Sequence, residues 1–571
     1  MTVNGIGFHC NTGGDHESFA VCYSGGNTGI DSLRFLGSPA SLENKQILTS
    51  CNGRSKMKML FLFCIVYTKQ EQTPEFYGGI IMETKARTPH KPSFIIAVIP
   101  VIVLLATMIA AVKVWGIDPH VPLILSCIAA ALCAVACGWN WEAIATGMLD
   151  SIKGTVEALL IIMCVGMLIG AWVWSGTMPA MVYYGLELIS PGIFLVVGAI
   201  LCAIVGVATG SSWTASGTVG VALMGVAMGL GIDAPIAAGM VISGAYMGDK
   251  LSPLSDSTNV AAASAQTPLY DHVAAMMTTT IPSFCIALVA YGILGAAIID
   301  KDGYDPTLAT AIQDAIQENF NINPFLLLPV LVVIFGAIKR VPAIPSLLLA
   351  AGVGAAFAMI FQGASLGDAL GALQYGYSIE SGNEVADKLL NRGGIDSMMW
   401  TISLIMFALA YGGILEKCGF IETLMGGLVK RIKTLGGLVA TTIITGIICD
   451  IILTDQYLAI MMPGKMLVGE YDKRGLSRSF LSRTTEDGGT LWSPMIPWNG
   501  CGAYQSATLG VPNLEFIPYA FMNLINPIYA IVITYLGIGI KYKEYDGLTG
   551  AALKEAKAKK KAELTAAKKA K

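Results

Sequence analysis

The sequence predicts an all-α polytopic membrane protein with inverted structural repeats, re-entrant hairpins and broken transmembrane helices. Three observations predict this fold class. The 571 residues are 54% hydrophobic and only 13% charged, whereas soluble domains carry about 25% charged residues. Apolar segments follow one another from residue 94 onward, and their order in the first part of the chain recurs in the second. This composition excludes a soluble enzyme, a disordered chain and a nucleic-acid-binding protein.

The two ends of the chain differ from the apolar part. Residues 1–81 are rich in Gly, Ser, Asn and Cys, and their apolar run 59–67 is too short to span a bilayer, which needs about 20 residues. We interpret residues 1–81 as a non-functional or disordered extension, because Met82 precedes the first strong span like a natural start. Residues 541–571 hold ten Lys and four acidic residues, which predicts a Lys-rich cytoplasmic tail.

Each half of the apolar part contains the same kinds of element in the same order. The first repeat, residues 92–300, is expected to contain spans 95–115, 121–137 and 156–174, a hairpin 194–232 with a polar tip at 209–218, a broken helix interrupted at 248–259, and a final span 276–299. The second repeat, residues 324–540, is expected to contain spans 324–338, 343–361 and 398–415, a hairpin 438–466 broken at 454–457, a broken helix around 486–499, and a last span 516–540. Residues 301–323 are the predicted external linker.

Loop charge predicts the orientation, because Lys and Arg stay in cytoplasmic loops. Residues 300–323 contain five acidic residues and one Lys, whereas 416–435 and 466–485 each contain four basic and two acidic residues. These signs alternate consistently only if segment 438–466 enters and leaves on the cytoplasmic side. The two repeats then have opposite orientations, and both termini are cytoplasmic.

The helix breaks predict transport. Non-helical backbone at membrane depth persists only where it is buried in protein or lines a water-filled cavity. Inverted repeats with discontinuous helices are typical of secondary transporters, whose site lies near the midplane. Both predicted broken helices carry Ser-Pro followed by Asn, with Pro253 and Pro494 as break formers. Their hydroxyl and carboxylate oxygens suit a hard cation such as Na⁺.

Ionisable residues at membrane depth are costly and usually functional, and most of them here lie in the breaks. Asp256 is predicted to bind Na⁺ or carry a proton; the alternative is an Asx cap that only satisfies the helix end. Asp455, at the tip of the second hairpin, is also predicted to be functional. The remaining candidates for ion or substrate binding are Ser252, Ser255, Ser257, Thr258, Asn259, Thr209, Ser211, Ser212, Thr454, Ser493 and Asn499.

A second group of ionisable residues is predicted to form a proton or charge network, namely Asp249, Glu486 and Asp487. Two structural alternatives stay open. Asp249 could be neutralised by Lys250, and Glu486 or Asp487 could pair with Arg483 at the cytoplasmic edge. Glu157 is interpreted as an interface residue or a partner of Lys153 at i, i+4.

Three runs of sequence resemble the signature of the NhaC family of Na⁺/H⁺ antiporters, within the ion-transporter superfamily. They are Thr209-Gly-Ser-Ser-Trp213, Gly244-Ala-Tyr-Met-Gly-Asp-Lys-Leu-Ser-Pro-Leu-Ser-Asp-Ser-Thr-Asn259, and residues 483–499. The resemblance implies a bacterial inner-membrane antiporter that expels Na⁺ in exchange for protons. It implies no cofactor, no catalysis and no partner beyond the lipid bilayer and the transported Na⁺ and H⁺, and it leaves homodimer formation open.

The family also includes exchangers of malate for lactate coupled to Na⁺ and H⁺, and such an organic-acid exchanger is the alternative. A dicarboxylate needs cationic or hydrogen-bonding groups directed at it. Neither hairpin tip contains Arg, and the second tip carries Asp455, which would repel an organic anion. Both features favour transport of cations alone.

Overall fold

The computed structural model describes residues 20–24, 32–36 and 88–546, the last range without 303–305, 340, 383–385, 388–389, 427–431 and 433, and scattered positions between 548 and 563. The chain forms two units, Met1–Ala86 and Arg87–Lys571. In the first unit, β1 (Ala20–Ser24) and β2 (Ser32–Leu36) pair antiparallel, with Ala20 opposite Leu36. The sequence analysis predicts no element there, and the rest of segment 1–81 lies outside the described residues.

The second unit is helical throughout its described part, apart from short connections and one isolated β-bridge between Leu476 and Tyr542. Among the described residues, seven helices are long and apolar enough to cross a membrane, or up to nine if two bent pairs each count as one span. The seven are α2 with the π-helical turn η2 (Phe94–Ala110 and Ala111–Trp115), α4 (Trp141–Trp174), α6 (Pro191–Thr209), α11 (Leu269–Asp302), α14 (Ala343–Gln362), α17 (Ile395–Lys417) and α19 (Leu435–Leu453). The second unit therefore has the helical, multi-pass membrane architecture that the sequence predicts.

The remaining helices are shorter. They are α3 (His120–Ala136), α5 (Thr177–Leu188), α12 (Pro306–Asn319), η4 with α13 (Pro324–Leu327 and Leu328–Ile338), α15 (Leu366–Tyr375), α18 (Phe420–Met425), α23 with η7 and α24 (Asn513–Phe516, Ile517–Tyr519 and Phe521–Tyr535), and η8 (Lys543–Tyr545). Helix α12 occupies most of the predicted linker 301–323, where sequence analysis predicts no helix.

Two apolar helices are each interrupted by only two residues. Helix α6 is followed by Gly210 and Ser211, and then by α7 (Ser212–Ala215), η3 (Ser216–Gly220) and α8 (Val221–Gly229). Helix α19 is followed by Thr454 and Asp455, and then by α20 (Gln456–Lys473). The predicted polar tip 209–218 is thus mostly helical, because Ser211 caps a new helix by accepting from Thr214 N at 3.1 Å.

Two further helices are broken by a longer segment. Helix α9 (Ala234–Leu251) precedes α10 (Asp256–Ser264), and α21 (Arg478–Trp492) precedes η6 (Ser493–Met495) and α22 (Gly500–Leu509). Both breaks begin later than predicted. Polar residues counted as part of the breaks, such as Lys250 and Asp487, are helical because they face partners in the protein interior rather than lipid.

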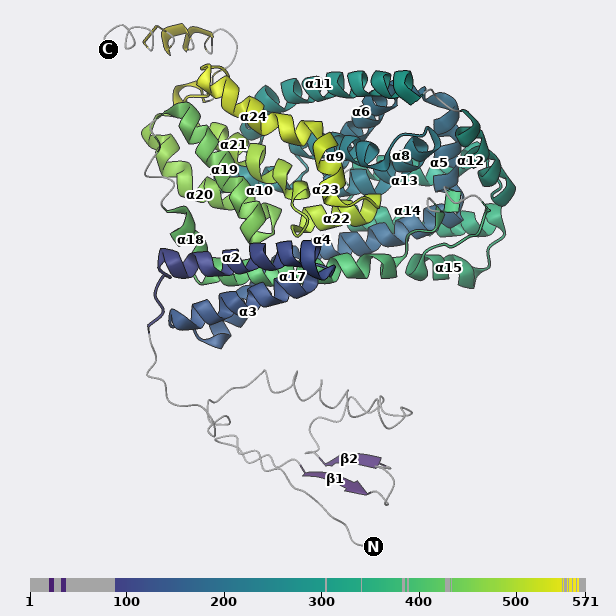
Figure 1. Cartoon of the computed structure of the whole chain (residues 1–571), viewed down its shortest axis with the longest axis horizontal. Helices are drawn as coiled ribbons and strands as arrows, with labels where there is room; N and C mark the ends of the chain where they lie inside the picture. The colour runs from purple at the N-terminus through teal and green to yellow at the C-terminus, as the bar shows by residue number, and fades with distance from the viewer. Residues whose placement is uncertain are drawn as a thin grey trace. The chain divides into compact units, whose positions relative to one another are not determined.

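Glycines bring each broken helix close to the preceding hairpin limb. A Cβ at Gly244 would lie 2.3 Å from Ala199 O on α6, and one at Gly488 would lie 2.6 Å from Ile443 O on α19. Only small residues permit such backbone contacts between membrane helices. Helices α4 and α17 lie side by side (Figure 1) and approach closely where Gly147 faces Gly413. In the view of Figure 1, the broken helices α9, α10, α21 and α22 lie between this pair and α11.

Candidate functional site

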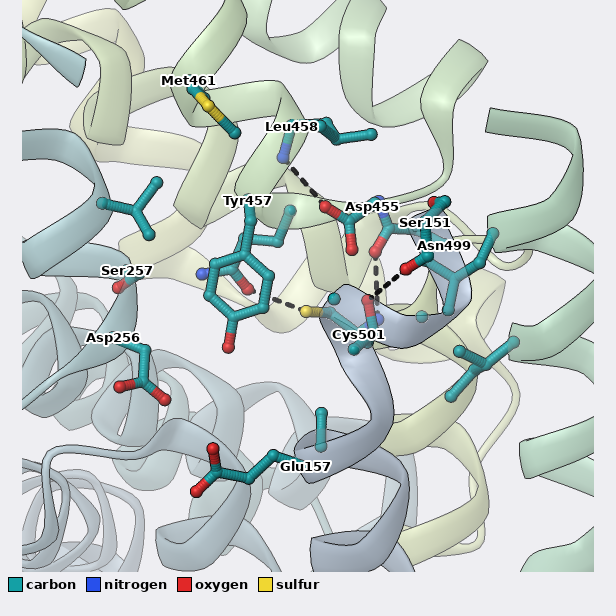
Figure 2. A pocket seen from close by; sticks show the side chains of 18 of the residues that line it. Ser151, Glu157, Asp256, Ser257, Asp455, Tyr457, Leu458, Met461, Asn499 and Cys501 are labelled. Carbon is teal, nitrogen blue, oxygen red and sulfur yellow. Dashed lines mark hydrogen bonds between the residues drawn. The ribbon is translucent and has the colours of Figure 1, made fainter. Parts of the chain in front are cut away.

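The four helix breaks meet at one cavity of about 910 Å³. Its lining comes from six segments, namely 147–161 of α4, 210–213, 249–260, 405–417 of α17, 454–461 and 499–501. Only the first part of α4 and the last part of α17 contribute. The rest of α4 is closely packed, since a Cβ at Gly166 would lie 2.6 Å from Gly394 O. Figure 2 shows the cavity with Glu157, Asp256 and Asp455 among the residues that line it.

The charge of the lining is strongly negative. Six acidic residues line the cavity, Asp150, Glu157, Asp249, Asp256, Glu416 and Asp455, against one basic residue, Lys417. With all of them ionised the lining carries five net negative charges, six minus one. Walls of one charge sign in a low-dielectric cleft concentrate ions of the opposite sign, so the cavity is suited to cations.

Asp256 is the first residue of α10, and its side chain is exposed to the cavity. The N-cap position belongs to Ser255, and α10 has no side-chain cap hydrogen bond. The structure therefore gives no support to the Asx-cap alternative. In Figure 2 the carboxylates of Asp256 and Glu157 point into the same space, with the Tyr457 hydroxyl directed toward it.

Glu157 is not placed as the sequence suggested. Lys153 lies 3.9 Å from Asp150 instead, and Glu157 lines the cavity. It is the seventeenth of the 34 residues of α4, so it lies at the middle of a membrane helix, where a charge is costly. Sequence analysis missed this because it started the span at 156, whereas Asn140 caps the helix by accepting from Ala143 N at 3.0 Å.

The hydroxyl groups predicted around Asp256 surround Asp249 instead. Ser212 Oγ donates to Asp249 Oδ2 at 2.7 Å, and Ser255 Oγ donates to Asp249 Oδ1. Ser257 Oγ lies 2.9 Å from Ser255 Oγ. Asp249 is only 5% exposed and lines the inner wall of the cavity. The first hairpin tip and the first broken helix are thus joined through one buried carboxylate.

Several predicted residues tie down the backbone of the first two breaks. Ser252 Oγ donates to Val207 O at 2.8 Å, Thr209 Oγ1 to Val205 O at 2.8 Å, and Asn259 Nδ2 to Ser255 O at 2.8 Å; Thr258 Oγ1 lies 3.5 Å from Asp249 O. The cavity is reached by Ser211, Ser212, Ser255, Ser257, Asn259, Thr454 and Asn499, but not by Thr209, Ser252, Thr258 or Ser493.

The second tip presents Asp455 to the cavity. Its Oδ1 accepts from Leu458 N at 2.8 Å, which caps α20. Nearby, Asn499 Nδ2 donates to Asp450 Oδ1 at 3.1 Å, and Gly500 N donates to Thr454 O at 3.0 Å. Asp450 is fully buried, and its Oδ2 has no hydrogen-bond partner in the described part of the chain. Sequence analysis could have included Asp450 among the site residues, because it lies only four residues before the break at Thr454.

A cluster of buried charges lies outside the cavity lining. Lys250 Nζ donates to Asp487 Oδ1, and Arg483 Nε lies 3.4 Å from Asp487 Oδ2. Lys250 therefore pairs with Asp487 and not with Asp249. His272 Nε2 lies 3.5 Å from Glu486 Oε1. Of the three predicted network residues, only Asp249 lines the cavity.

Comparison with known proteins identifies the family. Residues 244–538 match the model of the Na⁺/H⁺ antiporter family. The chain is 39% identical over 449 residues to the Na⁺/H⁺ antiporter NhaC of Bacillus subtilis, covering 78% of this chain and 98% of that protein. The chain belongs to the Na⁺/H⁺ antiporter family. This confirms the resemblance to NhaC, and it makes the acidic cavity the natural place to seek the ion path.

The chain is also similar to antiporters that are named for other substrates. The malate-2H⁺/Na⁺-lactate antiporter of Bacillus subtilis is 34% identical, over 77% of this chain and 95% of that protein. The arginine/ornithine antiporter ArcD of Halobacterium salinarum is 35% identical, over 78% of this chain and 93% of that protein. These relatives are antiporters rather than enzymes, and their names give Na⁺ and H⁺, malate and lactate, or arginine and ornithine as substrates.

Proposed function

We propose that this chain is a secondary active transporter of a bacterial plasma membrane that expels Na⁺ in exchange for protons. The observation that carries the proposal is the convergence of four helix breaks and six carboxylates on one cavity. Freed backbone carbonyls and helix ends at such breaks can coordinate a cation. The negative lining raises the local concentration of Na⁺ at the site.

Asp256 is the proposed first contact for Na⁺, because its carboxylate is exposed in the cavity and caps no helix. Asp249 lies on the inner wall with Ser212 and Ser255 donating to it. Their hydroxyl hydrogens are used in these bonds, so the remaining lone pairs of the serine oxygens are free to face a cation. In the second half, Asp455 at the hairpin tip and Asn499 before α22 provide the corresponding oxygens.

The lining disfavours an organic anion. Lys417 is the only basic side chain among the lining residues, and it lies beside Glu416. A malate dianion would face several carboxylates without a compensating Arg, so the organic-acid exchanger stays the second candidate. A cationic amino acid meets no such electrostatic objection, and the relationship to an arginine/ornithine antiporter places it among the compounds to be tested.

The arrangement of the helices supports inverted repeats. Helix α10 packs on α20, and α22 packs on η3 and α8; α11 packs on α21, and α24 on α9. The first two contacts are equivalent to each other when the two halves are exchanged, and so are the last two. With the orientation predicted from loop charge, the ends of α4 and α17 that line the cavity lie on the cytoplasmic side. The structure then corresponds to an inward-open state, and both termini are cytoplasmic.

Transport by purified protein in liposomes containing a pH-sensitive dye tests the function. Na⁺, K⁺, malate, lactate, arginine and ornithine are added separately. Na⁺ alone should change the internal pH. An absolute requirement for one of the organic compounds would replace the Na⁺/H⁺ antiporter with the corresponding exchanger.

Labelling of single cysteines tests the orientation. In a background without native Cys, the substitutions Asp233→Cys, Thr310→Cys, Glu380→Cys and Lys473→Cys are treated with an impermeant thiol reagent on intact cells. Asp233, Thr310, Glu380 and Lys473 are all exposed in the structure. The first three should be labelled from outside and the fourth should not. Labelling at 473, or protection at both 310 and 380, would refute the inverted topology.

A further inference from the structure

One buried pair of titratable side chains lies beyond the cavity and has no part in the sodium path described above. His272 comes from α11 and Glu486 from α21, and both side chains are 0% exposed. Neither oxygen of Glu486 has a hydrogen-bond partner in the part of the chain that the structure describes, and neither does Nε2 of His272. An ionised carboxylate buried without any donor is strongly unfavourable, so this pair requires an explanation.

His272 Nδ1 lies 2.8 Å from Ser482 Oγ, and which of the two atoms donates depends on the tautomer. Ser482 Oγ also has Ser479 O as an acceptor at 3.1 Å. With the serine hydrogen directed to Ser479 O, the contact with His272 is donated by Nδ1. In a neutral imidazole only one ring nitrogen carries hydrogen, so Nε2 then presents a lone pair. That lone pair faces Glu486 Oε1 at 3.5 Å.

Two acceptors facing each other in a buried site require a proton between them. The proton is held either by Glu486 as a carboxylic acid or by His272 as an imidazolium, and both assignments give Nε2 and Oε1 a donor and an acceptor. We propose that, in this tautomer, the gap between His272 Nε2 and Glu486 Oε1 is the binding site of the transported proton. This inference rests on the proposed exchange of Na⁺ for H⁺.

The surrounding charges explain how this proton could be coupled to Na⁺. The groups around the pair are Arg483 and Asp487 on α21, and Asp249 and Lys250 on α9. Lys250, Arg483 and the bound proton carry three positive charges, and Asp487, Glu486 and Asp249 carry three negative ones. Asp249 and Glu486 are close enough for their negative charges to repel each other. Na⁺ in the cavity beside Asp249 would leave one positive charge in excess and so expel the proton.

A polar route leads from the pair toward solvent. Ser482 lies against His272, and in the first turn of α21 Ser479 Oγ lies 2.9 Å from Ser477 Oγ. Ser477 Oγ donates to Asp546 Oδ1 at 2.6 Å, and Asp546 is exposed. In the inward-open state proposed above, the proton would leave its site along the start of α21 toward the cytoplasm, apart from the cavity that admits Na⁺.

Two measurements on Glu486→Gln in liposomes test the inference. Gln keeps the shape of Glu, and its amide donates permanently to Nε2, as the loaded pair does, but it releases no proton. Exchange of radioactive Na⁺ for Na⁺ needs no proton movement and should persist at saturating Na⁺. The Na⁺ concentration that it requires should rise, because the neutral Gln cannot offset the charge of bound Na⁺. Na⁺-driven pH change should fall at least about tenfold, as for loss of a group that must carry the proton. Asp271→Asn, which removes an exposed carboxylate next to His272, is the matched control and should keep both activities.

The outcomes separate the two proposals. If wild-type protein shows no Na⁺-driven proton movement, the proposed function itself fails. If wild-type protein shows it and Glu486→Gln moves protons equally well, the proton site is elsewhere and only this inference fails. Loss of Na⁺/Na⁺ exchange together with proton movement in a folded Glu486→Gln protein would also overturn it, because Glu486 would then serve Na⁺ binding or transport as a whole.

Discussion

The two hairpin tips have the same backbone geometry but different chemistry. Gly210 and Thr454 both have left-handed φ angles, 69° and 61°. The next residue caps the following helix in each case, with Ser211 accepting from Thr214 N and Asp455 accepting from Leu458 N. Equivalent positions thus perform the same structural task with an uncharged residue at one tip and an acidic residue at the other.

The carboxylates are distributed differently between the two halves. Near the cavity, the first half has Asp249 and Asp256 on α9 and α10, whereas the second half has Asp450 at the end of α19 and Asp455 before α20. Glu486 and Asp487 on α21 lie outside the cavity lining. Residues that begin the second half-helices reach these carboxylates in both cases, Ser255 to Asp249 and Asn499 to Asp450. Under the proposed inverted repeat, the backbone of the breaks is equivalent in the two halves, whereas the charges make each half a different part of the candidate site.

The largest effect is expected from Asp256→Asn, which removes the exposed carboxylate of the first half. It should abolish Na⁺-driven pH change in liposomes, because no other residue of α10 supplies a charge. The protein should stay folded, since Asp256 caps no helix. Asp233→Asn, which removes an exposed acid that makes no cap bond before α9, is the control. Normal exchange by Asp256→Asn would move the cation contact to Asp249 or to the second half.

A smaller effect is expected from making the second tip like the first. Asp455→Ser keeps a capping oxygen but removes the charge, so transport should fall at least about tenfold, as for a functional intramembrane acid, while the unfolding temperature stays unchanged. Asp455→Ala should lose the same transport and also destabilise the protein by about 1 kcal/mol, the usual cost of a lost cap. Thermal unfolding in detergent and liposome transport measure the two effects. Full transport by Asp455→Ser would show that this acid only caps α20.

The order of the membrane elements was predictable because long apolar segments and polar interruptions are visible in the sequence. The first and last residues of these elements were harder to predict where polar residues are helical and buried in protein. Helix α21 contains Arg483, Glu486 and Asp487 at full burial, so its composition resembles a loop although partners on α9 and α11 satisfy part of its charge. Hydropathy reports lipid contact, and it fails for helices whose neighbours are other polar helices.

The site was predictable as a set of breaks but not as a set of contacts. Sequence proximity placed the serines around Asp256. The turn at Ser255 directs its hydroxyl back to Asp249 instead, and Ser212 reaches Asp249 from 37 positions earlier. The cavity position of Glu157 and the contact of His272 with Glu486 depend on tertiary structure, because α4 and α11 are distant in sequence from the residues they face.

The smallest effect tests the shared backbone of the tips. Gly210→Ala should destabilise the protein by about 1–2 kcal/mol, the cost of a left-handed conformation for an L-residue, and its new Cβ would lie 2.8 Å from Leu254 C. Thr454→Gly removes such strain but makes the unfolded chain more flexible, so its net change should stay within about 1 kcal/mol. Unfolding temperatures in detergent compare the two variants. The opposite result would be a stable Gly210→Ala variant and a strongly destabilised Thr454→Gly variant. It would mean that the Thr454 side chain, whose Oγ1 donates to Leu453 O at 2.6 Å, stabilises the second tip. The first tip would then tolerate a side chain, and the likeness of the two backbones would not reflect a common constraint.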